Sequence, residues 1–193
     1  MLKKKIITSL IILLSTAAFS QSRFNAGASF NIGIPSSSLA NISQTGIGGS
    51  AIGEFAFSEK VSAILSASYQ NFPGKSDGFA IQGKVIDFSV NSIPILAGVR
   101  YYFSPEFFGV VEAGVNFLRV SADIYEVYSE EKVSTDYEAK FGGGIGAGYR
   151  YRLAEPSVLE ISGNYQLVQD NFNSFSIRIG ILILLDNIWD SKI

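Results

Sequence analysis

The sequence contains no cysteine and no histidine among its 193 residues, and both absences limit its chemistry. Without histidine, Ser-His-Asp and Cys-His catalysis and the commonest metal ligand are excluded. We therefore predict that the protein is not an enzyme, and we assign it no catalytic residue, cofactor or metal site. Without cysteine, an exported domain has no disulfide to hold it together, and closing a β-barrel is one way to do without.

The chain also lacks an apolar run of about 18 residues, the length that a transmembrane helix requires. Only 17% of the residues are charged, whereas 47% are hydrophobic and the mean hydropathy is +0.26. The 19 glycines, 15 phenylalanines and 9 tyrosines suit twisted strands and aromatic belts better than helices. The length fits a single domain.

Residues 1–20 have the pattern of a secretory signal peptide. Three lysines at 3–5 precede a short apolar segment at 6–14, and small residues flank Phe19 before Gln21. We predict cleavage after Ser20 and a single domain over 21–193. Removing the leader leaves 12 basic and 17 acidic residues, a net charge of −5, which argues against a nucleic-acid partner.

Residues 157–185 contain two consecutive segments in which apolar and polar residues alternate. Within 159–167 the odd positions are apolar or glycine, while the even positions from Glu160 to Gln166 are polar. Within 175–185 the odd positions are apolar again. Since successive side chains of a strand point to opposite faces, each segment has one apolar face. That face points inward in a soluble sandwich but outward to lipid in a transmembrane barrel.

The same alternation recurs along the chain and predicts eight strands. They cover 23–34, 47–57, 61–70, 93–103, 107–117, 137–152, 157–167 and 175–185. Upstream of the fourth strand the alternation changes parity, which predicts a β-bulge at residues 91–93. The longest break, 121–136, is acidic. We expect a solvated loop there, or a site for a divalent cation or bridged lipopolysaccharide.

The breaks between these strands differ in length in a regular way. The first, third and fifth are long, whereas the other four are short. Outer-membrane barrels have short periplasmic turns and longer outer loops. Aromatic residues on the apolar face would form two interfacial belts. The belt at the short turns holds Phe55, Phe57, Tyr101, Phe103, Phe107, Tyr149 and Tyr151, and the other holds Tyr69, Phe117, Tyr137, Tyr165 and Phe175.

The polar face of the strands collects nine charged residues. They are Glu54, Arg100, Glu112, Glu138, Lys140, Arg150, Arg152, Glu160 and Arg178. Eight strands enclose a lumen that side chains just fill, so these charges would pair inside it. Four glycines at even positions 142–148 leave room for them. The charge network either holds the barrel interior together or gates a narrow pore.

Together, the leader and the eight strands resemble the small outer-membrane barrels of Gram-negative bacteria, of the OmpA/OmpX-like kind. The segment IPILAGVRYYF at 93–103 is similar to the fourth strand of porin-family outer membrane protein β-barrel domains of Bacteroidetes type. The resemblance implies an integral outer-membrane protein, folded by the barrel-assembly machinery and surrounded by outer-membrane lipid and lipopolysaccharide. That family usually ends on an aromatic residue, whereas here residues 186–193 extend past the last strand.

We therefore predict an all-β fold: a closed, antiparallel, eight-stranded up-and-down transmembrane β-barrel behind a cleavable signal peptide. The expected role is structural, or interaction with an unknown surface ligand. A narrow channel or a small-solute-binding barrel is the second hypothesis. A secreted, soluble, lipocalin-like carrier is the third.

Overall fold

The structure is a computed structural model that describes residues 23–75, 85–126 and 129–185. Almost all of these residues lie in strands. The elements are β1 (Arg23–Pro35), α2 (Ser37–Ile42), β2 (Gly46–Ala56), β3 (Val61–Pro73), β4 (Val85–Tyr102), β5 (Phe107–Glu126), β6 (Ser129–Ser134), β7 (Glu138–Ala154), β8 (Ser157–Val168), η1 (Gln169–Asn171) and β9 (Ser174–Leu184). No helix of this described part is long and apolar enough to cross a membrane. The predicted signal peptide and the 186–193 tail lie outside the described residues.

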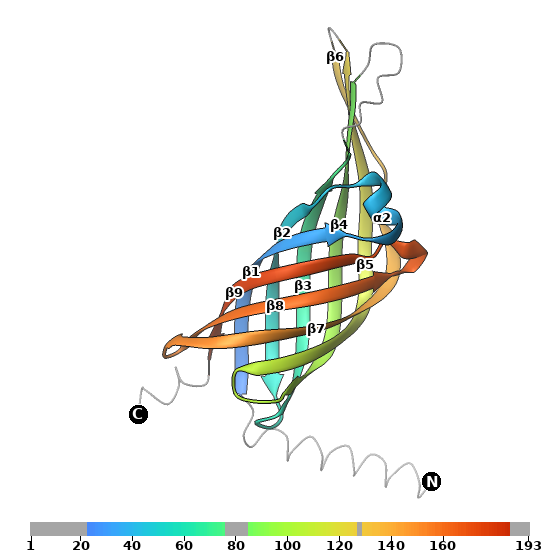
Figure 1. The fold of residues 1–193 in the computed structure, drawn as a ribbon. Helices are drawn as coiled ribbons and strands as arrows, with labels where there is room; N and C mark the ends of the chain where they lie inside the picture. The colour runs from blue at the N-terminus through green and yellow to red at the C-terminus, as the bar shows by residue number, and fades with distance from the viewer. Residues whose placement is uncertain (1–22, 76–84, 127–128, 186–193) are drawn as a thin grey trace, which may run out of the picture.

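Eight of the strands close into an antiparallel barrel (Figure 1). Each pairs with the next along the chain, in the order β1, β2, β3, β4, β5, β7, β8 and β9. The last strand then returns to the first, from Asn25 opposite Leu184 to Pro35 opposite Ser174. Every wall strand therefore has a neighbour on both sides, which closes the fold without a disulfide. The predicted fold class is confirmed.

Strand β6 lies outside the barrel wall. Among the described residues it pairs only with the upper part of β5, from Ser121 opposite Ser134 to Glu126 opposite Ser129. Because β4 pairs with β5 along its whole length, residues 85–88, 121–126 and 129–134 form a three-stranded sheet beyond the barrel (Figure 1). We name it the projecting sheet. The prediction of a loop at 121–136 is therefore wrong for most of that segment. Residues 121–126 and 129–134 pair as strands although apolar and polar residues no longer alternate there.

The bulge predicted at residues 91–93 is also wrong. Strand β4 keeps a constant register against both β3 and β5. The change of parity has another cause, because Val90 points into the barrel, where it is 1% exposed and packs with Leu39 and Phe72. An apolar cluster inside the lumen thus reverses the usual polarity of the strand while the backbone stays regular.

The two ends of the barrel differ in the length of their connections. At the end where β1 begins and β9 finishes, the connections are residues 57–60, 103–106 and 155–156. The other end carries α2, the β3–β4 connection, the projecting sheet and η1 (Figure 1). We name these the short-turn end and the loop end. The predicted alternation of short and long connections is confirmed.

The barrel exposes its apolar side chains and buries its polar ones. On β9, Ile179 and Ile181 are 45% and 50% exposed, whereas Arg178 is 8% exposed. Near the short-turn end, outward aromatic rings pair at centroid distances of 4.8–5.2 Å: Phe55 with Phe57, Tyr101 with Phe103, and Phe107 with Tyr149. This orientation is that of a transmembrane barrel and the reverse of a soluble lipocalin-like carrier.

Candidate functional site

Polar side chains from all eight wall strands fill the lumen. They occupy the strand positions that alternate with the exposed apolar residues, and nearly all are buried. The uncharged ones nearer the loop end include Asn31, Ser50, Ser68, Gln70, Ser92, Asn116, Gln166 and Ser176. Hydrogen bonds join several of them, such as Gln166 Nε2 to Asn116 Oδ1 at 2.8 Å. These buried, hydrogen-bonded side chains form a polar core inside the barrel.

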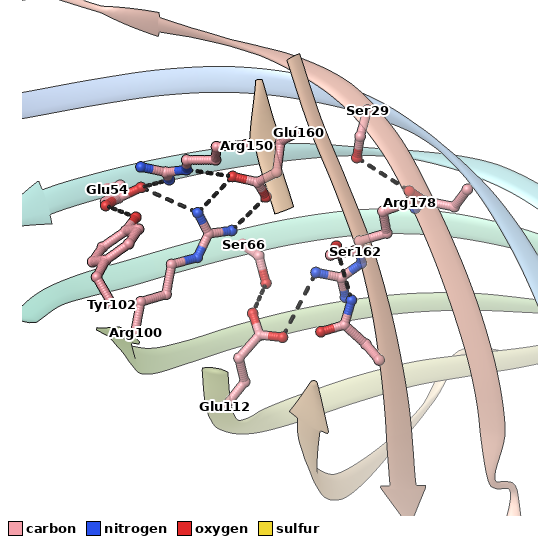
Figure 2. Close-up of polar contacts among 12 residues, drawn as sticks. Ser29, Glu54, Ser66, Arg100, Tyr102, Glu112, Arg150, Glu160, Ser162 and Arg178 are labelled. Atoms are coloured by element: carbon pink, nitrogen blue, oxygen red, sulfur yellow. Dashed lines mark hydrogen bonds and ion pairs between the residues drawn. The ribbon is translucent and has the colours of Figure 1, made fainter. Parts of the chain in front are cut away.

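Four charged side chains meet in the lumen and form one cluster, which we name the ion quartet (Figure 2). Arg100 on β4 lies 3.1 Å from Glu54 on β2 and 2.7 Å from Glu160 on β8. Arg150 on β7 pairs with Glu54 and lies 3.1 Å from Glu160 through Nε. Two positive and two negative charges thus cancel, and the pairs connect four strands across the barrel.

Aromatic rings pack against the quartet on the side of the short-turn end. The Tyr102 hydroxyl donates a 2.6 Å hydrogen bond to Glu54. The Arg100 guanidinium lies 4.4 Å from the centroid of the Phe108 ring, and that of Arg150 lies 4.8 Å from the Tyr102 ring. Both rings belong to a buried apolar cluster: Ile64, Tyr102, Phe108 and Val110. This cluster keeps water from the ion pairs, and low polarity strengthens them.

A second ion pair lies beside the quartet. Nη1 of Arg178 is 3.6 Å from Glu112, whose other carboxylate oxygen accepts a 2.8 Å hydrogen bond from the Ser66 hydroxyl (Figure 2). A cavity of about 10 Å³ borders Arg178, Ser29 and Glu160. That volume holds one water molecule and no larger solute.

Glycines on the inner face of β7 make room for these larger side chains. A Cβ atom at Gly148 would overlap the Phe108 ring, and one at Gly146 would overlap the Asn164 side chain. A bulkier residue at either position would displace groups that support the quartet or the polar core.

The loop end of the lumen is closed by a cluster that we name the apolar cap. It consists of Leu39 from α2 together with Phe72, Val90 and Phe172. Beside it, Lys140 Nζ lies 2.6 Å from Asp170 and 3.0 Å from Glu138, which ties the β8–β9 connection to β7. This cap was not predicted from the sequence, because α2 is only six residues long and the parity of Val90 is also that of a bulged strand.

The nine charged residues predicted for the lumen fall into four groups. Four form the quartet, and Glu112 with Arg178 lies next to it. Lys140 and Glu138 pair at the loop end, where the Glu138 side chain is 71% exposed. Arg152 is exposed and joins no ion pair within the described part of the chain. Tyr102 and Phe108 were not predicted, although they share the strand parity of the buried charges.

Metal binding was predicted only as an option for the acidic segment 121–136. Most of its carboxylate side chains lie outside the described ones. The side chains that are described include no group of three or more potential metal ligands.

Comparison with known proteins identifies the family of this barrel. The sequence profile of the family "Outer membrane protein beta-barrel domain" matches residues 6–181, most of the chain. The chain belongs to that family. It is an outer-membrane barrel protein, so its exposed apolar belt faces the hydrocarbon of the outer membrane. No match is found among curated protein sequences.

Several solved outer-membrane barrels share the fold. Ail of Yersinia pestis, in complex with the heparin analogue sucrose octasulfate, is 12% identical with a TM-score of 0.56, covering 84% of this chain and 98% of Ail. OprG from Pseudomonas aeruginosa is 12% identical with a TM-score of 0.55, covering 86% and 97%. Neisserial surface protein A is 18% identical with a TM-score of 0.53, covering 86% and 99%. At these identities the likeness concerns the fold alone.

Proposed function

We propose that this outer-membrane barrel is a structural scaffold that holds the projecting sheet outside the cell, and that its lumen carries no solute. The filled lumen is the observation that supports this role most directly. From the short-turn end to the loop end, four layers follow one another: the buried apolar cluster of Tyr102 and Phe108, the ion quartet, the polar core and the apolar cap. With short turns on the periplasmic side, the projecting sheet faces the exterior.

A test of the closed lumen is conductance of the purified protein in planar lipid bilayers. We expect no unitary current steps, because the side chains of the quartet and of the cap occupy the lumen at two levels. A channel would show steps that disappear in Arg150→Ala or Glu112→Ala, and such steps would contradict the scaffold role. Insertion is checked separately, by the shifted migration of unheated protein on a denaturing gel.

Among the described residues, no strand pairs with the far side of β6, which we name the open edge of the projecting sheet. The Thr135 N–H donates a 3.0 Å hydrogen bond to the Val120 carbonyl. Since bonded pairs alternate along an antiparallel ladder, residues 129, 131 and 133 bond β5. The backbone groups of 130, 132 and 134 then point to the open edge. Such an edge is where an extended partner segment adds as a further strand.

The charge of the projecting sheet indicates the kind of partner. The sequence between 119 and 136 contains five acidic residues, Asp123, Glu126, Glu130, Glu131 and Asp136, against one arginine and one lysine. A basic, extended polypeptide complements this surface, whereas a polyanion such as the one bound to Ail does not. We infer that the partner of this barrel is a basic segment of an external protein.

A proline at the open edge tests this mode of binding. We expect Lys132→Pro to weaken binding of a short synthetic peptide of alternating lysine and threonine about tenfold, since it removes an edge N–H. Surface plasmon resonance on protein held in lipid nanodiscs measures the affinity. The control Lys132→Gln removes the same positive charge but keeps the N–H, and its affinity should equal or exceed that of the wild type. Equal loss in both variants would contradict strand addition.

A further inference from the structure

A row of polar side chains crosses the outer surface of the barrel just above its apolar belt. Asn71 on β3 lies opposite Asn91 on β4, which lies opposite Arg119 on β5. The Arg119 guanidinium is 5.5 Å from the ring centroid of Tyr137, just before β7. Asn71 and Asn91 point outward, because each lies between two buried positions of its strand. Arg119 is half-buried and shares their face through its register with Asn91, and Tyr137 is 44% exposed. We name these four residues the polar row.

The residues next to the polar row on the membrane side are apolar or aromatic. They are Tyr69, Ile93, Phe117 and Ala139, each two positions along its strand. Tyrosine and arginine at such a boundary are typical of the interface between hydrocarbon and headgroups. The polar row therefore lies at headgroup height on one side of the barrel.

The hydrogen bonds of the polar row leave donors without acceptors. Asn91 Oδ1 accepts from the Tyr69 hydroxyl at 2.7 Å and from Asn71 Nδ2 at 2.8 Å. The Asn91 amide nitrogen has no hydrogen-bond partner within the described part, so it faces outward as a free donor. Next to it, Arg119 donates through Nη2 to the Ser134 hydroxyl. Its Nε is buried and has no partner within the described residues, so Nη1 is the guanidinium nitrogen that remains to donate to a ligand.

Arg119 also has no counterion among the described side chains. No carboxylate in the described part of the chain lies within ion-pair distance of it. The other arginines and lysines of the wall strands whose side chains are described are in the lumen, except Arg152, which is exposed at the opposite end of the barrel. One side of the barrel thus presents a lone cation and a free amide donor at headgroup height.

We propose that the polar row binds the phosphate of a phosphorylated lipid in the outer leaflet. Arg119 and Asn91 donate to the phosphate oxygens, and the acyl chains lie along Ile93 and Phe117. Guanidinium and phosphate match as charge-assisted hydrogen-bond partners. The acid-rich projecting sheet begins directly above the row and repels free anions, which favours a phosphate already held in the plane of the bilayer.

Native mass spectrometry of the full-length protein, released from detergent with added lipid, tests the site. With phosphatidylglycerol as the probe, we expect one retained lipid per barrel. Retention should fall about tenfold in Arg119→Gln, the loss expected for one charged hydrogen bond. Asn91→Leu should give a smaller loss, and Arg119→Lys should keep part of the retention. Arg152→Gln, at the opposite end of the barrel, is the matched control and should match the wild type.

Three outcomes would overturn the proposal. Equal retention by Arg119→Gln and the wild type would remove Arg119 from the site. Equal retention of an uncharged glycolipid would show that acyl chains alone bind. Displacement of phosphatidylglycerol by inorganic phosphate would indicate a general anion site in place of a lipid site. Heat-modifiable gel migration of each variant shows that the barrel is folded, so loss of retention is not loss of structure.

Discussion

Replacing Arg100 with methionine should lower the free energy of unfolding by about 3–5 kcal/mol, the usual effect of removing one partner from a buried ion pair. Arg100 lies between Glu54 at 3.1 Å and Glu160 at 2.7 Å, and its side chain is 3% exposed. Without it, two buried carboxylates share the single positive charge of Arg150. Unfolding by guanidinium in phospholipid vesicles, followed by loss of the heat-modifiable gel band, measures the change.

The control for this prediction is Arg152→Met, which removes the same type of side chain from an exposed position on β7. Its effect should stay within about 0.5 kcal/mol, as for most surface substitutions. The double variant Arg100→Met, Glu160→Gln should recover part of the loss, because it also removes one of the stranded charges. Similar unfolding midpoints for Arg100→Met and Arg152→Met would contradict a tight ion quartet.

The faces of the strands could be predicted from the sequence because their cause is local. Because side chains alternate along a strand, Arg178 and Ile179 point to opposite faces of β9, whatever the rest of the chain does. The charged residues could be assigned to the polar face for the same reason. Their pairing could not, since Glu54 and Glu160 meet the arginines only once the stagger of all eight strands is fixed.

The predictions that were wrong concern the loop end, where no surrounding lipid imposes the alternation of apolar and polar residues. Val90 is an apolar residue on the inner face, where it packs against Leu39. An apolar residue at an inward position changes the parity of the alternation in the same way as a β-bulge. Strand β6 carries no apolar face and is held by backbone pairing with β5, which leaves no periodic signal. In the part of the chain beyond the membrane, strands continue without an alternation of apolar and polar residues, so the alternation does not reveal them.

Placing an arginine at Ile179 should lower the free energy of unfolding by about 2–4 kcal/mol, the cost of this residue near the bilayer midplane. Ile179 lies at the centre of the outward face of β9, midway between Phe175 and Ile183. Its side chain is 45% exposed, so substitution with arginine creates no steric conflict with the barrel interior. Guanidinium unfolding in phospholipid vesicles measures the effect.

Val133→Arg makes the matching change in the projecting sheet. Val133 is 48% exposed, nearly the same as Ile179, so an exposure-based comparison in water predicts equal and small effects for the two substitutions. If lipid covers the barrel wall and water covers the projecting sheet, only Ile179→Arg should be destabilising, and the difference should shrink when micelles of a short-chain detergent replace the bilayer. The two side chains are almost equally exposed, so only contact with lipid would make their effects differ. Equal effects in vesicles would therefore mean that the apolar belt does not face hydrocarbon.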